Sequence, residues 1–164
     1  MSRLLLLAAL LAAPALAADP LDAPLDAIAT IHGEAGPWAA AGHRMASYAM
    51  AKLGVTPGKG DLLVQHRSPR AVQFSCVADG AQAATKASVG KLSLSWSEAT
   101  LEEMQTVFTR PSTGASVVLR PSKRFVERFL NAPREKARAN ARLVLTLPDA
   151  DVFEVVSSAP ARGP

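Results

Sequence analysis

The segment FSCVADGAQAAT, residues 74–85, places four chemically capable side chains at three-residue steps. They are Cys76, Asp79, Gln82 and Thr85, and on a helix residues three apart share one face. Such a stripe is unsuited to a core, because three of its members carry polar groups whose burial without partners costs about 1–3 kcal/mol each. Either the stripe faces solvent with Cys76 tucked beneath it, or it lines a pocket in which Cys76 acts as a thiolate.

Cys76 is the only cysteine of the chain, so no internal disulfide can form. Three roles remain for it: a small buried apolar residue, an intermolecular disulfide, or a functional thiolate. We expect Cys76 where a strand at residues 71–76 ends and a helix begins. Such a helix N-terminus would lower the pKa of the thiol.

His32 and Glu34 stand in a glycine-broken loop, HGEAGP. Together with the thiolate of Cys76 they could form a three-ligand site for zinc or a similar metal, with one position open for water or a ligand. Alternatively, His32 is a helix-terminal histidine that bonds to the backbone. A Cys–His nucleophile pair would need a third, orienting group, which the sequence does not identify. His43 and His66 are expected at the surface or behind the site.

The elements that position these residues follow from periodicity and from turn residues. Pro37 suits the first turn of a helix and Gly54 its end. The segment KLSLSWS alternates strictly, which predicts a half-buried strand with Leu92, Leu94 and Trp96 on one face. The expected helices begin at residue 26 and after Cys76, or cover residues 37–53, 122–131 and 133–147, the last of which begins with Pro133. The expected strands cover residues 61–67, 71–76, 91–97, 104–110 and 115–120. The last two strands are expected to form a hairpin.

These elements predict an α+β fold: a single domain with a mixed or antiparallel sheet of four to five strands, packed by N- and C-terminal helices. Residues 1–17 carry Arg3, an apolar run and a small-residue site near Ala17, which is typical of a signal peptide. We therefore expect an exported protein, periplasmic or secreted, with no stable membrane anchor, since the run is too short to span a bilayer. The expected boundaries are an extended lead-in at 18–25, the α+β domain at 26–156 and a disordered tail at 157–164.

The charge pattern argues against a nucleic-acid partner. The formal net charge is +4, the basic residues are spread along the chain, and aromatic residues make up 5% of it. Binding of nucleic acid would call for a clustered basic face or a set of stacking aromatic side chains.

Three blocks of the chain resemble the FmdE-like family, which takes its name from a component of formylmethanofuran dehydrogenase. The family reads H-G-H-x-C-P-G with a G-x-R a few residues on, then C-x-x-D-x-x-Q-x-x-T-G-x-T-x-G-K, and later R-x-T-G. The matching residues are His32, Gly33, Gly42 and Arg44 in the first block, Cys76, Asp79, Gln82, Thr85, Gly90 and Lys91 in the second, and Arg110, Thr113 and Gly114 in the third. The resemblance covers most of residues 25–155.

The chain departs from the family pattern at two ligand positions. Glu34 stands where the family has its second histidine, and Gly36 replaces the first-block cysteine. No cysteine remains for the C-terminal zinc-finger extension that some members carry. The resemblance implies an α+β core, often dimeric, with His and Cys side chains around a metal. Here only His32 and Cys76 map onto that set, and the carboxylate of Glu34 could replace a ligand.

The predicted function is therefore an exported FmdE-like protein that binds a divalent transition metal, with zinc expected, and a small polar or anionic ligand in a His/Cys pocket. The metal ligands would be His32, Glu34 and Cys76. The remaining block residues would serve the ligand: Asp79, Gln82 and Thr85 by orienting it, Arg44 and Lys91 by supplying positive charge. No reaction or catalytic residue is specified. The alternatives are a metal-free ligand-binding or accessory module on the same scaffold, and an interaction protein joined through a Cys76 disulfide.

Overall fold

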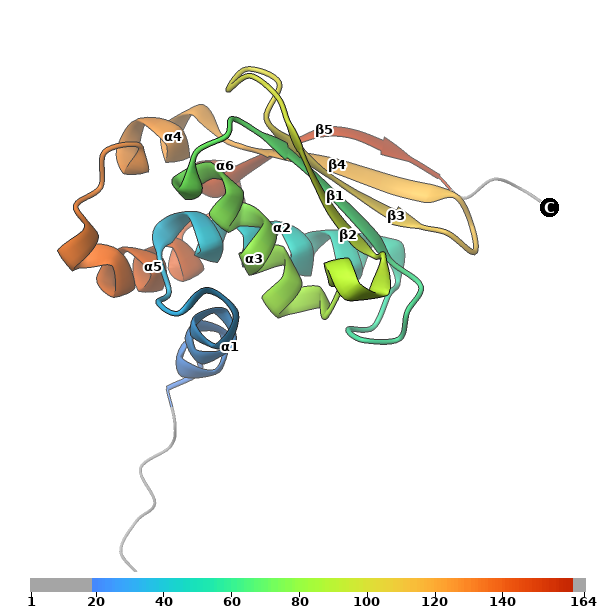
Figure 1. Cartoon of the computed structure of the whole chain (residues 1–164), viewed down its shortest axis with the longest axis horizontal. Coiled ribbons are helices and arrows are strands. Elements are labelled where there is room, and N and C mark those ends of the chain that lie inside the picture. Colours follow the sequence, from blue (N-terminus) through green and yellow to red (C-terminus); the bar gives the residue numbers. More distant parts are fainter. Residues whose placement is uncertain (1–18, 161–164) are drawn as a thin grey trace, which may run out of the picture.

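The computed structural model describes residues 19–160, so the predicted signal peptide lies outside the described residues. Figure 1 shows helices gathered on one side of a twisted sheet. In chain order the elements are α1 (Asp22–His32), α2 (Pro37–Leu53), β1 (Leu63–Ser68), α3 (Val72–Thr85), the 3₁₀ turn η1 (Val89–Lys91), β2 (Leu94–Glu98), β3 (Gln105–Arg110), β4 (Ala115–Pro121), α4 (Lys123–Phe129), the 3₁₀ turn η2 (Arg134–Lys136), α5 (Ala137–Thr146), α6 (Asp149–Val152) and β5 (Phe153–Ala159).

The five strands form one mixed sheet in the order β2-β1-β3-β4-β5. β1 and β2 run parallel, and the other neighbouring pairs are antiparallel. A parallel pair needs a crossover connection, and α3 with η1 supplies it. The predicted α+β class is thus confirmed, and of the alternatives that the sequence left open the sheet is mixed and has five strands.

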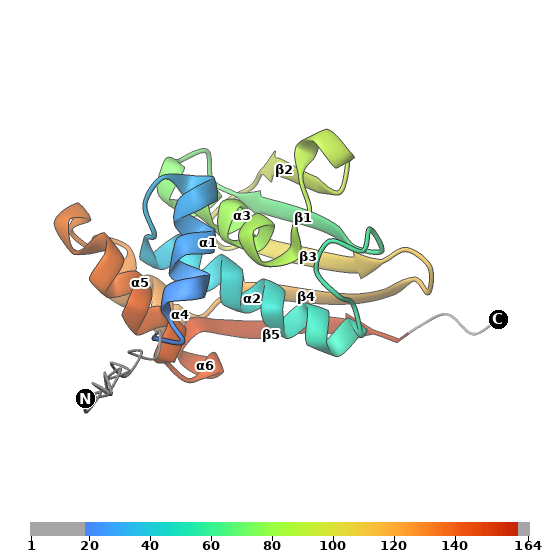
Figure 2. The ribbon, with the colours of Figure 1, turned by 90° about the horizontal axis from the view of Figure 1, so that it is seen from below.

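The core lies between the sheet and a layer of helices. Figure 2 shows α1, α2 and α3 in front of the sheet, with α5 beside them. Alternate strand residues such as Val64, Phe108 and Leu119 point toward the helices and are buried, whereas Gln65 and Arg67 of β1 are exposed on the opposite face. This alternation follows from the two-residue period of a strand.

Two glycines bring the backbones of α2 and α3 into direct contact. A Cβ atom on Gly80 would lie 1.8 Å from the carbonyl oxygen of Ala39, and one on Gly42 would lie 2.0 Å from the carbonyl oxygen of Val77. Only glycine lets the helices approach this closely, since any larger side chain would overlap the facing backbone. The crossing fixes the position of α3, which carries Cys76.

The predicted helix at 37–53 is confirmed as α2. Pro37 occupies its first position and Gly54 ends it with a left-handed φ of 63°. The hairpin of β3 and β4 is also where the sequence predicts it.

The extended lead-in predicted for 18–25 is wrong, because α1 begins at Asp22. A carboxylate oxygen of Asp19 accepts a hydrogen bond from the amide of Leu21 and its carbonyl accepts one from Asp22, which starts the helix. Pro24 stands in the first turn, where its missing N–H breaks no helical bond. Leu25 is fully buried, so the first turn of α1 is part of the core.

The strand predicted for 71–76 is wrong as well. Ala71 is extended and its carbonyl accepts the amides of Phe74 and Ser75, so α3 begins at Val72. The apolar residues of this stretch fit a strand in isolation. Packing of α3 against α2 at the glycine crossing overrides that local preference.

Two further expectations fail at the edges of the sheet. Ser157, Ser158 and Ala159 belong to β5 and pair with β4, so the tail predicted as disordered from 157 is ordered to the end of that strand. β2 begins only at Leu94, and Leu92 before it is 87% exposed with a left-handed φ of 54°. Trp96 is also partly exposed. Of the three residues predicted to form the buried face of this strand, only Leu94 is buried.

His66 is buried between the sheet and α3 rather than at the surface. Its Nε2 lies 3.1 Å from the carbonyl oxygen of Phe74, which accepts the proton, so Nδ1 accepts the hydroxyl proton of Thr106 at 2.9 Å. Burial lowers the pKa of His66 to about 4, and its hydrogen bond to Phe74 only partly offsets that effect.

None of the helices within residues 19–160 has the length and apolar character needed to cross a membrane.

Candidate functional site

His32 is the last residue of α1, and the chain turns sharply after it. Gly33 has a positive φ of 86°, which favours glycine, and its amide donates to the carbonyl of Ala29 to close the helix. The loop then passes through Glu34 to Gly36, and α2 begins at Pro37. The turn leaves the imidazole at the end of α1, pointing toward α3.

The imidazole of His32 lies between two residues that are one helical turn apart on α3. Its Nδ1 is 2.7 Å from a carboxylate oxygen of Asp79, and its Nε2 is 3.2 Å from Sγ of Cys76. Cys76 and Asp79 share a helix face as the sequence predicts, although Cys76 stands in the second turn of α3 rather than at its start. Three predicted site residues therefore form one chain of contacts, Cys76–His32–Asp79.

The carboxylate fixes the tautomer of the imidazole. An ionised Asp79 can only accept, so Nδ1 carries the proton and the lone pair of Nε2 faces Cys76. The thiol also lies 2.9 Å from the carbonyl oxygen of Val72, so it has two acceptors for its single proton. Asp79 thus supplies the orienting group that a Cys–His pair needs and that the sequence did not identify.

The thiol of Cys76 is held in its neutral form. Burial raises its pKa, the negative charge of Asp79 raises it further, and together they bring it to about 11. This is opposite to the lowered pKa expected for a cysteine at a helix N-terminus. The reason is position: Cys76 is one turn inside α3 and only 8% exposed, so loss of hydration outweighs any help from the helix dipole.

A cavity of about 580 Å³ opens beside the Cys76–His32 pair. Its wall combines the loop after α1, the first turns of α2 and α3, and the segment from Phe129 to Ala137. Trp38 forms part of the wall and is held in place, since its Nε1 donates to the carbonyl of Phe129 at 3.1 Å. A cavity of this size suits a small molecule, and its polar lining side chains are His32, Glu34, Gln73, Cys76 and Arg134.

Comparison with known proteins decides the family. The family model described as "FmdE, Molybdenum formylmethanofuran dehydrogenase operon" matches residues 31–154, from the last two residues of α1 to the second residue of β5. The chain belongs to the FmdE family. A search of curated proteins gives no match.

Several of the residues shared with the FmdE family lie away from the cavity. Arg44 donates to the carbonyls of Val144 and Leu147 and pairs with Asp149, so it closes the C-terminal end of α5. Thr85 donates to the carbonyl of Ala81 at 2.7 Å and ends α3.

Two more predicted ligand-binding residues also take other positions. Lys91 does not line the cavity and donates to the carbonyl of Lys86, just after the C-terminal end of α3, at 3.0 Å. Gln82 is half-buried on α3 and does not line the cavity either. The positive charge at the cavity comes instead from Arg134, which precedes α5.

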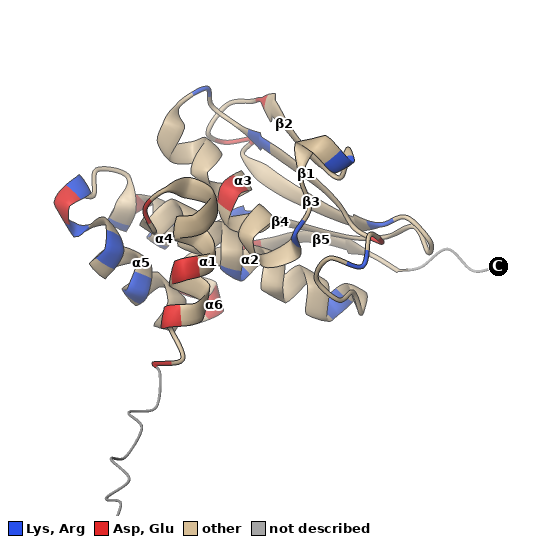
Figure 3. Cartoon of the chain, turned by 60° about the horizontal axis from the view of Figure 1, so that its bottom comes forward, with Lys and Arg blue, Asp and Glu red and all other residues tan. Residues whose placement is uncertain are grey.

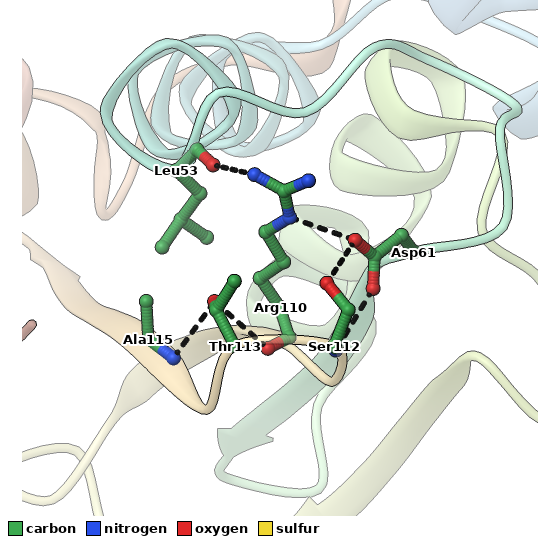
Figure 4. Close-up of polar contacts among 6 residues, drawn as sticks. All are labelled: Leu53, Asp61, Arg110, Ser112, Thr113 and Ala115. Carbon is green, nitrogen blue, oxygen red and sulfur yellow. Dashed lines mark hydrogen bonds and ion pairs between the residues drawn. The ribbon is translucent and has the colours of Figure 1, made fainter. Parts of the chain in front are cut away.

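The third FmdE block is a junction between elements. Figure 4 shows Arg110 at the end of β3, with Nε 2.7 Å from a carboxylate oxygen of Asp61 and a further bond to the carbonyl of Leu53 at 3.2 Å. The hydroxyl of Ser112, the guanidinium of Arg110 and the amide of Ser112 together lower the pKa of Asp61 to about 2. Arg110 thereby ties the end of α2 and the loop before β1 to the β3–β4 hairpin.

The residues beside the cavity fit two of the four positions of a zinc site. Zn–N and Zn–S bonds at a tetrahedral angle put the two donor atoms about 3.5 Å apart, close to the 3.2 Å between Nε2 of His32 and Sγ of Cys76. Asp79 holds the other ring nitrogen, as carboxylates commonly do behind a ligating histidine. Glu34 lines the same cavity but is exposed, and residues 19–160 contain no group of three ligand side chains already gathered.

Sequence reasoning missed Trp38, Gln73 and Arg134 as cavity residues. Trp38 could have been found, because it follows Pro37 at the start of the helix predicted for 37–53, and a helix start beside a glycine loop is a common place for a ligand. Arg134 carried no such signal. It reaches the cavity only because the chain after α4 returns to α2, as Figure 1 shows for the α4–α5 connection.

Proposed function

We propose that this FmdE-family chain binds a divalent transition metal, with zinc the expected ion, through Nε2 of His32 and Sγ of Cys76, and admits a small polar or anionic ligand to it from the adjoining cavity. The observation that carries the proposal is the Cys76–His32–Asp79 arrangement, in which Asp79 directs the Nε2 lone pair of His32 toward Cys76.

The protein's own residues have distinct tasks in this proposal. Cys76 would hold a cation as its thiolate, so the thiol proton would have to leave to solvent, and the burial that raises the pKa of Cys76 would make binding weaker at low pH. His32 donates its Nδ1 proton to Asp79 throughout. Arg134 supplies positive charge for an anionic ligand, and Trp38 and Phe129 limit the size of that ligand. When bound, the metal would supply Lewis-acid polarisation of a ligand oxygen.

Glu34 is the protein side chain best placed to complete the ligand set. It lines the cavity and is exposed between two glycines, so its carboxylate is free to turn without disturbing the core. The remaining positions would be taken by water or by the ligand, which is the pattern of an open rather than a closed zinc site.

A metal-free pocket is the second candidate, and one observation favours it. Within residues 19–160, His32 and Cys76 are the only two side chains in contact here that could both face a metal from the cavity, and no third ligand is gathered beside them. In that case the cavity binds its ligand directly, and the polar groups of His32, Gln73 and Arg134 recognise it.

Metal analysis of the purified protein separates the two candidates. We expect about one transition ion per chain in the wild type, and less than a tenth of that in Cys76→Ser and His32→Gln. Ser75→Ala is the matched control, because Ser75 neighbours Cys76 but does not line the cavity, and its hydroxyl bonds only to the carbonyl of Val72. With Co²⁺, a thiolate-to-metal charge-transfer band should appear in the wild type and be absent from Cys76→Ser. Wild-type protein that holds no ion after incubation with zinc would reject the metal and leave the metal-free pocket.

We also propose that the chain is exported, which the pattern of residues 1–17 supports. Intact mass of the mature protein from the producing cells should correspond to a chain that begins at Ala18. A mass that includes Met1 and Arg3 would count against export by this route.

A further inference from the structure

The turn between α3 and β2 carries two apolar side chains that nothing within the described chain covers. Val89 is 68% exposed and Leu92 is 87% exposed, and both belong to the segment Lys86–Ser93. Figure 2 shows this turn, yellow-green beside β2, projecting from the edge of the sheet. We call residues 86–93 the knob.

The knob is held in a strained and well-defined conformation. Lys86 and Leu92 are the two non-glycine residues with positive φ among residues 19–160, at 63° and 54°. The amide of Leu92 donates to Val89 at 2.9 Å, and Ser88 and Ser93 bond to each other through backbone and side chain. A bulky residue at positive φ costs about 1–2 kcal/mol. Leu92 therefore bears both strain and exposure, and no burial within the described chain compensates for either.

Three lysines lie on the knob and on the loop next to it. Lys86 and Lys91 belong to the knob, and both line a small hollow together with Gly58 and Gly60 of the neighbouring loop. Lys59, exposed between those glycines, adds a third charge. None of the ion pairs within residues 19–160 involves a lysine.

Acidic side chains are few in this region. The knob contains no acidic residue. Asp61, at the end of the glycine loop, is already bonded to Arg110 and Ser112. Figure 3 shows blue segments on the turn after α3 and on the neighbouring loop.

We propose that the knob docks reversibly on an anionic phospholipid surface, with Val89 and Leu92 entering the headgroup region and Lys59, Lys86 and Lys91 facing lipid phosphates. Exposed apolar side chains with lysines on the same turn and on the neighbouring loop have the two components of interfacial binding, shallow insertion and attraction to anionic lipid. A stable protein interface buries about 800 Å² on each partner, far more than this narrow turn presents. Val89, Leu92 and the three lysines do not line the cavity beside Cys76, so this proposal is independent of the metal.

Vesicle partitioning tests the proposal. Binding is measured by cosedimentation with phosphatidylcholine vesicles that contain or lack phosphatidylglycerol. The wild type should bind only when phosphatidylglycerol is present, and added salt should release it. Every variant carries the same N-terminus as the wild type, so any contribution of residues 1–18 is common to all of them.

Two pairs of variants isolate the knob. Lys86→Gln with Lys91→Gln should weaken binding by on the order of tenfold or more, since each lysine near an anionic surface contributes roughly fivefold. Lys123→Gln with Lys136→Gln removes the same charge elsewhere and should change binding by less than about twofold. Leu92→Gly should weaken binding several-fold, whereas Val156→Ser, at another exposed valine, should not.

Three results would overturn the proposal. One is a wild-type protein that does not bind phosphatidylglycerol vesicles. Another is equal loss of binding in the two lysine double variants, which would indicate attraction by net charge alone. The third is unchanged binding by Leu92→Gly, whose fold circular dichroism should show to be intact because glycine accepts a positive φ freely.

Discussion

Gly80→Ala should destabilise the protein strongly, because Gly80 is where α3 touches the backbone of α2. The new Cβ would lie 1.8 Å from the carbonyl oxygen of Ala39, whereas ordinary contact begins at 3.4 Å, so the two helices would have to separate by about 1.6 Å. Overpacking that side chains can absorb costs about 1–3 kcal/mol. Here the obstacle is backbone, which cannot move aside as a side chain can. We therefore expect the free energy of unfolding to decrease by at least about 3 kcal/mol, even though alanine is favoured over glycine in a helix by roughly 1 kcal/mol.

Urea unfolding followed by circular dichroism measures this change. Gly90→Ala is the matched control, since no atom lies within 4 Å of the added Cβ and its φ is not positive, and its free energy of unfolding should stay within about 0.5 kcal/mol of the wild type. Gly42→Ala, which would meet the carbonyl oxygen of Val77 at 2.0 Å, should behave like Gly80→Ala. A Gly80→Ala variant as stable as the control would refute the close approach of α2 and α3.

Three further predictions concern single residues. The pKa of His66 is lowered from 6.5 to about 4, so neutral His66 stabilises the fold fully above pH 6.5. As the pH falls from 6.5 toward 4, the free energy of unfolding should decrease by roughly 3 kcal/mol. Urea unfolding at a series of pH values should show this decrease in the wild type and not in His66→Gln. In chelator-treated protein, the rate at which iodoacetamide modifies Cys76 should be low at neutral pH and should increase toward pH 11. Asp79→Asn should shift this pH profile to lower pH. An unshifted profile would show that the charge of Asp79 does not act on the thiol. Leu92→Gly should raise the free energy of unfolding by up to about 1 kcal/mol, because it removes the strain of a positive φ at a side chain that packs on little, and a loss of stability would contradict this.

The parts of the fold that the sequence predicts are those with strong local signals. Pro37 and Gly54 mark the ends of α2, and the β3–β4 hairpin joins two apolar runs across a short turn. The predictions that are wrong concern segments whose conformation depends on partners far away in the sequence. Val72 to Cys76 looks like a strand until α2 is present, and residues 153–159 show no alternation because β5 is an edge strand with a bulge.

The candidate site divides in the same way. Cys76 and Asp79 are three apart on one helix, so their shared face is visible in the sequence. The position of His32 between them depends on tertiary structure. In the sequence it is indicated by the family resemblance and not by residue spacing. The sequence suggests a ligand-binding role for Arg44, but this residue bonds to main-chain carbonyls at the end of α5, which leave no trace in side-chain patterns, and to the distant Asp149. Arg134 reaches the cavity by the path of the chain alone.

The placement of His32 at the very end of α1 has a consequence for local motion. α1 is the first described element and lies on α3 rather than within the sheet, so it can open without unfolding the strands (Figure 2). Whatever bridges His32 and Cys76 joins α1 to α3. Occupancy of the site should therefore slow hydrogen exchange of the α1 amides much more than that of β3 or β4. Amide protection of α1 would then report whether the site is filled.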